Sequence, residues 1–175
     1  MLIPSNTAAE AYELNGNPVP RHRYREGYIT AVSAGFFFIL VGMFFVVTPN
    51  LYDKVIAFFR DFDAVSVPNM QHVLFPAPTT PNEHMTVYTV AGQFSLIWGF
   101  FQIAILTLRF VGSSPLHKKA ETASNAVFWL GTNYLISTYL NEASTITTWF
   151  TFWTLIIMLI GVSLIVRAII LASRM

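Results

Sequence analysis

Three residues in a proline-rich stretch have the side chains that metal ions prefer. His72, Glu83 and His84 lie between Pro68 and the second apolar run, with Asp61 and Asp63 earlier in the same stretch. Imidazole nitrogens and carboxylate oxygens are common ligands of Zn²⁺. Their spacing matches no ligand motif on a rigid element, however, and proline-rich loops position ligands poorly. His72, Glu83 and His84 are therefore weak metal candidates, and we predict no bound metal and no cofactor.

A second set of residues consists of polar side chains within apolar stretches. On a helix, at about 100° per residue, four of them share an arc of roughly 120°. The four are Glu121, Asn125, Thr132 and Asn133. An unsatisfied amide in hydrocarbon costs several kcal/mol, so this arc must face another helix or a water-filled path. The sequence therefore predicts a use for the arc in helix packing or in a transport pathway.

Two glutamines on the preceding apolar stretch are the expected partners of this arc. Gln93 and Gln102 are nine residues apart, so on a helix they point to opposite faces. We expect one of them to pair with the arc. The other should then face a different helix or another subunit.

The sequence contains no recognisable set of catalytic residues. It contains no cysteine, which excludes thiolate nucleophiles and Cys-based metal sites. It also has no Gly-x-Ser-x-Gly elbow, no Gly-rich phosphate loop and no paired carboxylates within its apolar stretches. All four histidines lie outside those stretches, where they could not hold a haem between membrane helices. We expect a protein that is not an enzyme.

The elements that position these residues are four long apolar stretches. Each reaches or exceeds the roughly 20 residues that a hydrocarbon core of about 30 Å requires. They cover residues 28–47, 85–108, 120–140 and 146–171, and the third is the weakest by hydropathy. We expect a single transmembrane domain over residues 1–175, an all-α four-helix bundle, with an outer loop at 49–84.

The basic residues predict the orientation, since Lys and Arg beside membrane spans stay on the cytoplasmic side. Eight of the ten fall on one side of the four stretches, and only Lys54 and Arg60 fall on the other. Both ends and the segment 1–26 should therefore be cytoplasmic. The residues expected to anchor this topology are Arg21, Arg23, Arg25, Lys118 and Lys119. A contact with anionic lipid, worth about 1 kcal/mol per basic residue, is the alternative interpretation of the first cluster.

The outer loop divides into an amphipathic part and a proline-rich part. Apolar residues at Leu51, Val55, Phe58, Phe59 and Phe62 share one helical face, which predicts a short helix in the membrane interface. The remainder, with Pro68, Pro76, Pro78 and Pro81, should be an extended cap with little regular structure.

The functional hypotheses follow from this organisation. With 54% hydrophobic and 11% charged residues and a net charge of +1, the expected partners are the lipid bilayer and other membrane subunits, and no nucleic acid. We favour a noncatalytic accessory or scaffolding subunit of a membrane complex in the plasma membrane. The alternative is a homo-oligomeric channel or transporter lined by the polar arc of span three. An intramembrane enzyme or ligand receptor has only pocket-forming aromatic residues in its favour.

Overall fold

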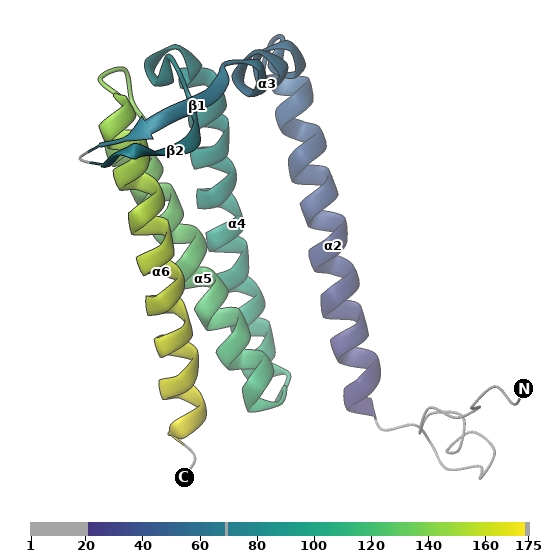
Figure 1. Ribbon diagram of the computed structural model, residues 1–175. Coiled ribbons are helices and arrows are strands. Elements are labelled where there is room, and N and C mark those ends of the chain that lie inside the picture. Colours follow the sequence, from purple (N-terminus) through teal and green to yellow (C-terminus); the bar gives the residue numbers. More distant parts are fainter. Residues whose placement is uncertain (1–20, 69, 174–175) are drawn as a thin grey trace, which may run out of the picture. The chain divides into compact units, whose positions relative to one another are not determined.

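The computed structural model describes residues 21–68 and 70–173 and is predominantly helical. The chain divides into two compact units, residues 1–36 and 37–175, and the second contains the site described below. The elements in chain order are α2 (Arg21–Val47), α3 (Leu51–Arg60), β1 (Phe62–Val67), β2 (Met70–Pro78), η1 (Pro81–His84), α4 (Met85–Val111), α5 (Leu116–Tyr139) and α6 (Ile146–Ala172) (Figure 1).

The four apolar stretches form helices close to their predicted bounds, because long uncharged runs leave few places for a helix to end. The largest difference lies at the first helix, which begins at Arg21 and not at residue 28. The apolar part of this helix, Gly27–Val47, matches the predicted span, and the helix continues it into the polar residues from Arg21. No proline occurs between Pro20 and Pro49 to interrupt the helix. The side chains of Arg21, Arg23 and Arg25 lie outside the described residues.

The helices α4, α5 and α6 pack side by side, with α5 in contact with both of its neighbours. Glycines permit the close approach. A Cβ atom on Gly99 of α4 would lie 2.7 Å from Leu130 Cδ2 of α5, and one on Gly131 of α5 would lie 2.6 Å from Leu159 Cδ1 of α6. A hydrogen bond also joins α5 to α6, since the Ser124 hydroxyl donates to the Ser163 carbonyl at 2.7 Å.

Three helical segments among the described residues are long and apolar enough to cross a membrane. They are Gly27–Val47, Pro81–Val111 and Ile146–Ala172. The helix α5 is not among them, because its sequence carries buried polar residues such as Thr122, Ser124 and Thr132. The chain thus has the helices of a membrane protein, as expected, and α5 has a composition suited to contact with other helices.

The segment after α3 corrects one prediction. The strands β1 and β2 pair as an antiparallel hairpin with an irregularity between Ser66 and Val67, where a cap with little regular structure was expected. A two-stranded sheet has only edge strands, and edge strands tolerate proline. Pro76 and Pro78 therefore fit into β2 opposite Ala64 and Phe62. The fold is helical with a β-hairpin, and is not entirely α-helical.

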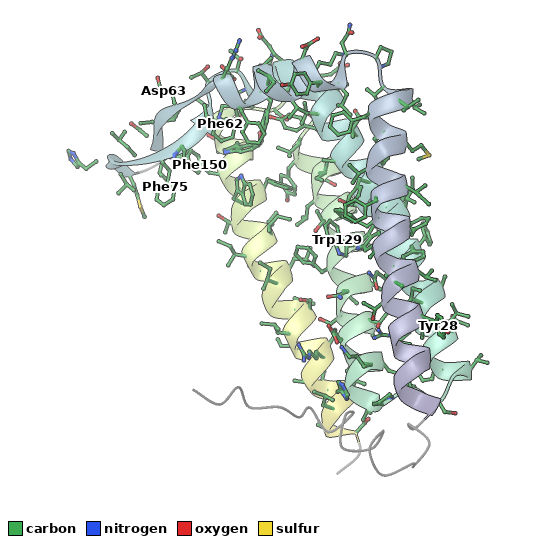
Figure 2. The ribbon with its side chains drawn as sticks, turned by 90° about the vertical axis from the view of Figure 1, so that its right-hand side faces the viewer. Tyr28, Phe62, Asp63, Phe75, Trp129 and Phe150 are labelled. Carbon is green, nitrogen blue, oxygen red and sulfur yellow. The ribbon has the colours of Figure 1, made fainter. Side chains whose placement is uncertain are left out.

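An aromatic cluster packs the hairpin against the helices. Trp149, 4% exposed, has ring neighbours from three other elements, which are Phe58 of α3, Phe62 of β1 and Tyr88 of α4. Beside it, an apolar cleft of about 500 Å³ lies between the hairpin and α6. Figure 2 labels Phe62, Phe75 and Phe150, which line this cleft. Apolar contacts thus hold the hairpin against the helices, together with the polar cluster around Asp61 that is described below.

Candidate functional site

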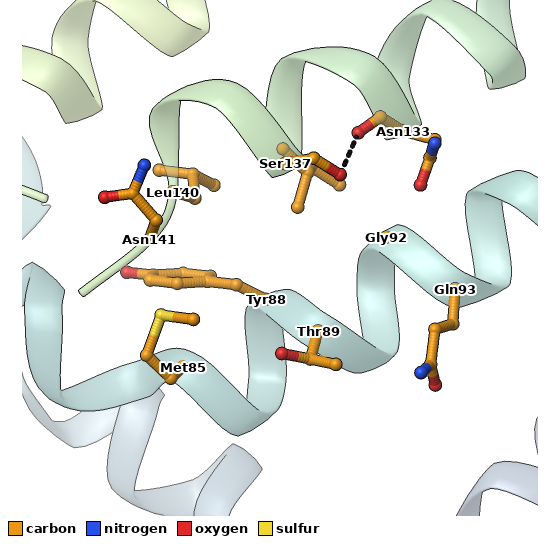
Figure 3. A pocket seen from close by; sticks show the side chains of 10 residues that line it. Met85, Tyr88, Thr89, Gly92, Gln93, Asn133, Ser137, Leu140 and Asn141 are labelled. Atoms are coloured by element: carbon orange, nitrogen blue, oxygen red, sulfur yellow. Dashed lines mark hydrogen bonds between the residues drawn. The ribbon is translucent and has the colours of Figure 1, made fainter. Parts of the chain in front are cut away.

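A polar groove of about 200 Å³ lies between the first half of α4 and the last half of α5 (Figure 3). Its lining is mixed, with five residues from α4 and five from α5 and the turn that follows it. They are Met85, Tyr88, Thr89, Gly92, Gln93, Asn133, Ile136, Ser137, Leu140 and Asn141. None of these residues is ionisable at neutral pH, so the groove offers hydrogen bonds without a formal charge.

Hydrogen-bonding groups without partners distinguish this groove. The Tyr88 side chain is 3% exposed, and its buried hydroxyl has no hydrogen-bond partner among the described residues. The amides of Gln93 and Asn133 likewise make no hydrogen bond within the part of the chain that the structure describes. Buried polar groups are usually paired, so the unpaired Tyr88 phenol is unusual, whereas Gln93 is exposed and Asn133 is only partly buried.

Two other polar residues of the groove already make hydrogen bonds within the chain. The Ser137 hydroxyl donates to the Asn133 carbonyl at 2.9 Å. The Asn141 amide donates to the Thr138 carbonyl at 3.1 Å, and its oxygen accepts from the Ala143 N–H at 2.9 Å. Side chains without a hydrogen bond among the described residues thus remain at Tyr88, Thr89, Gln93 and Asn133.

Gly92 keeps the groove open at its centre. A Cβ atom there would lie 3.4 Å from Ile136 Cγ2 and 3.6 Å from the Asn133 side-chain oxygen. Both are ordinary contact distances, so a methyl group would fit without steric strain and would occupy space beside Asn133. The small residues Gly92, Ser95 and Gly99 lie buried along the same face of α4. They set the distance between α4 and α5 on which the groove depends.

The start of α4, which carries Tyr88, is fixed by a carboxylate. Asp61 follows α3 and accepts hydrogen bonds from the Thr79 hydroxyl, the Thr80 N–H at 2.9 Å and the Thr80 hydroxyl at 3.0 Å. The His84 Nε2 lies 2.9 Å from the same carboxylate. Burial alone would raise the pKa of Asp61, but these hydrogen bonds outweigh it and hold the pKa well below its usual range. Asp61 is therefore ionised at neutral pH.

The other end of α4 is fixed by a guanidinium. Arg109 is 8% exposed, and its Nη1 donates at 2.6 Å to both the Lys118 carbonyl and the Thr122 hydroxyl. These bonds span the short connection between α4 and α5. Arg109 thus joins α4 to α5 at one end of their interface, whereas the Asp61 cluster joins the start of α4 to the segment around the hairpin.

The structure distributes the predicted polar residues over several environments. Asn133 and Gln93 both line the groove. Gln102 is buried, Asn125 is exposed, and the buried Thr132 hydroxyl donates to the Phe128 carbonyl at 2.8 Å. Glu121 pairs with Lys118 at 3.1 Å. The predicted arc is therefore not one site, because only its Asn133 end faces the groove.

The three weak metal candidates also lie in different environments. His72 and Glu83 are exposed, whereas His84 is buried against Asp61. Within the described part of the chain, no three His, Asp or Glu side chains form a group able to hold a metal ion. The role of His84 is instead to contact the Asp61 carboxylate.

Sequence reasoning missed the Asp61 cluster and Tyr88. Asp61 precedes β1, and Thr79 follows β2, so the pairing of Phe62 with Pro78 brings the two together. The sequence feature that could have revealed the hairpin is the alternation of β-branched and aromatic residues around Pro68. The prolines in the same stretch made this pattern hard to recognise.

No protein family, curated protein or solved structure matches this chain.

Proposed function

We propose that this chain is a noncatalytic membrane protein with four spans, which acts as an accessory or scaffolding subunit of a membrane complex. In this proposal α2, α4, α5 and α6 cross the bilayer, and both termini face the cytoplasm. The helix α3 lies in the outer interface, and the hairpin lies outside. The asymmetry of the basic residues supports this orientation, and the plasma membrane is the location that we propose.

The fourth span rests on the place of α5 in the bundle. It has 24 residues, which corresponds to about 36 Å of helix, and it contacts both α4 and α6. Its polar groups Thr122, Ser124 and Thr132 are buried in the protein, so they would not face lipid. A helix in this position can cross a bilayer with a lower hydropathy than a lipid-facing helix needs.

The interfacial position of α3 has support from its two faces. Leu51 is buried and Val55 and Phe58 are half-buried, whereas Asp53 and Arg60 are exposed. Tyr52 and Phe59 remain 67% and 66% exposed, which suits a helix that contacts lipid head groups and the upper acyl chains.

Topology can be tested directly because the chain has no cysteine of its own. We would place one cysteine at a time at Ser66, Ser113 or Ala143, which are all exposed, and label intact cells with a membrane-impermeant maleimide. Ser66→Cys and Ala143→Cys should react from outside, and Ser113→Cys only after permeabilisation. If Ser113→Cys and Ala143→Cys react from the same side, α5 does not span and the four-span proposal is wrong.

The subunit role rests on one observation, the exposed amide of Asn125 on α5. It lies nine residues into the helix and makes no hydrogen bond within the described part of the chain. In a spanning α5 this amide would be about 14 Å from the helix start, within hydrocarbon, where an unpaired amide is costly. A helix of another membrane protein would satisfy it, as polar side chains do across many membrane helix interfaces.

Purification from native membranes in mild detergent tests this role. The tagged chain should recover a stoichiometric protein of different sequence, and Asn125→Leu should reduce that recovery several-fold. Asn82→Leu is the matched control, because Asn82 is an exposed amide in η1 and should not affect recovery. A chain that purifies alone as a closed ring would contradict the subunit role. It would favour the channel, for which Asn133→Leu should alter conductance more than stability.

A further inference from the structure

We propose that the apolar cleft between the hairpin and α6 holds an acyl chain of a membrane phospholipid. The inference rests on the proposed position of α6 across the bilayer. It goes beyond the subunit role, because it assigns a ligand to this chain. The two strands and α6 supply the lining, which consists of Phe62, Val67, Phe75, Pro76, Trp149, Phe150, Trp153, Thr154 and Ile157.

The chemistry of this lining selects a hydrocarbon. No lining residue carries a charge, and the one lining hydroxyl, that of Thr154, donates to the Phe150 carbonyl at 3.0 Å. A charged or strongly polar group would lose its hydrogen bonds to water in the cleft and gain few in return. The aromatic and aliphatic side chains offer dispersion contacts, which suit a chain of methylene groups.

The cleft continues into an apolar stripe along α6. Trp153 and Ile157 line the cleft and are exposed. Ile160 and Leu164 are also exposed, and the spacing of four, three and four residues places all four side chains on one helical face. The helix α6 is long and apolar enough to cross a membrane. In a bilayer this stripe faces lipid, and the cleft lies at its upper end, toward the start of the helix.

The length of the stripe matches one leaflet. From Trp153 to Leu164 the helix rises about 16 Å. Half of a hydrocarbon core is about 15 Å, which is the depth that one acyl chain spans. The cleft volume of about 500 Å³ falls within the roughly 300–1,000 Å³ of pockets that hold small ligands. The upper part of an acyl chain therefore fits in the cleft while the remainder lies along the stripe.

The hairpin has a surface that suits contact with lipid. Residues 64–82 contain no Asp, Glu, Lys or Arg, and Met70, Leu74 and Phe75 of β2 are exposed. Edge strands that face water usually carry charges, which prevent association. An uncharged hairpin beside the tryptophans of α6 fits the membrane surface, where tryptophan is enriched. Phospholipid is the solvent there, so it fills a cleft that opens to the bilayer.

Native mass spectrometry of the purified full chain tests this occupant. The chain is delipidated in detergent, mixed with phosphatidylcholine and then released from the micelle. We expect one phosphatidylcholine to remain bound per chain. Glycerophosphocholine, which has the same head group but no acyl chains, should not be retained.

Variants of two threonines locate the lipid in the cleft. Thr154→Phe adds a ring to the lining and should lower the fraction of lipid-bound chain several-fold. Thr151→Phe is the matched control, because Thr151 is also exposed and its hydroxyl donates to the Thr147 carbonyl at 2.9 Å, but it does not line the cleft. Thr154→Val removes the hydroxyl at nearly constant volume and should retain as much lipid as the unmodified chain.

Several results would overturn the proposal. Retention of glycerophosphocholine, or loss of the lipid in Thr154→Val, would mean that a polar group is recognised. A chain that retains no phosphatidylcholine, or equal retention in Thr154→Phe and Thr151→Phe, would show that the cleft holds no lipid. If Thr154→Phe instead lowers recovery of a partner protein or breaks a homodimer, with lipid retention unchanged, a protein occupies the cleft.

The subunit role can fail independently of this proposal. Asn125→Leu should reduce recovery of the partner from native membranes without changing lipid retention, because Asn125 does not line the cleft. The proposed topology is tested separately by the cysteine labels.

Discussion

The two ends of α4 are held by opposite charges in different surroundings. At the start, the Asp61 carboxylate collects hydrogen bonds from Thr79 and Thr80 and contacts His84, groups 18 to 23 residues further along the chain. At the far end, Arg109 bonds to Lys118 and Thr122, only 9 and 13 residues away. The first cluster attaches a hairpin to the bundle, whereas the second closes a tight connection between neighbouring helices.

The difference determines how each end responds to its surroundings. Asp61 retains 18% side-chain exposure, and its carboxylate can be protonated in strong acid. Arg109 is 8% exposed and cannot lose its charge in a protein. The hairpin end is therefore sensitive to acid, while the α4–α5 connection has a permanent charge that depends on its acceptors.

Removal of the arginine charge should have the largest effect. We expect Arg109→Met to lower the free energy of unfolding by about 3 kcal/mol, because two charge-assisted hydrogen bonds from a buried guanidinium are lost and only the bond of the Thr122 hydroxyl to the Lys118 carbonyl remains. Reversible unfolding in mixed micelles, followed by tryptophan fluorescence, measures this change.

The matched control for this prediction is Arg109→Lys, which keeps the charge and its effect on membrane orientation. It should restore part of the loss, since one ammonium can reach fewer of these acceptors in the right geometry. An Arg109→Met protein as stable as the unmodified chain would show that the connection is held by helix packing alone.

Neutralisation of the carboxylate should have a smaller effect that depends on pH. We expect Asp61→Asn to cost about 2 kcal/mol at neutral pH, because an amide accepts weaker hydrogen bonds from Thr79, Thr80 and His84. The pKa of Asp61 is lowered in the folded protein. Its contribution is therefore complete above the ordinary carboxyl pKa and is lost as the pH falls through the lowered one.

Unfolding midpoints measured from neutral to acidic pH test the sign of this dependence. The difference between the unmodified chain and Asp61→Asn should shrink as the pH falls below the ordinary carboxyl pKa. Arg109→Met should show no such convergence with the unmodified chain. A constant difference for Asp61→Asn down to the most acidic pH would contradict the stabilised carboxylate.

The contrast between the two ends of α4 also explains which features of the structure the sequence could predict. The helices could be predicted from long uncharged runs, because the thickness of a membrane constrains the length of each run. Gln93 and Asn133 stood out as polar residues among apolar ones, and both line the groove. The Asp61 cluster could not be found this way, because it depends on the pairing of β1 with β2 and prolines argued against that pairing. The hydrogen bonds of Arg109 depend on the turn at Ser113. The backbone there has a φ of 53°, but no glycine at this position marks the turn in the sequence.

Packing between the two ends should be more sensitive to added volume than the free helix faces. A Cβ on Gly99 would lie 2.8 Å from Leu130 Cγ and 3.2 Å from its backbone nitrogen. We expect Gly99→Ala to cost about 1 kcal/mol net, because overpacking outweighs the gain in helix propensity. Gly161→Ala is the control, since nothing lies within 4 Å of its Cβ position. Equal effects of the two substitutions would show that α4 and α5 separate easily.

The smallest effect should be the energetic coupling between the two ends. His84 and Arg109 are 25 residues apart, so about 38 Å of helix separates the clusters. Sites this distant without shared partners usually have additive effects within about 0.5 kcal/mol. In a double-mutant cycle, Asp61→Asn and Arg109→Met should therefore add. A larger coupling energy would mean that α4 transmits strain along its length through the groove. The two ends would then form one cooperative unit, and acid at the hairpin end would weaken the distant connection to α5.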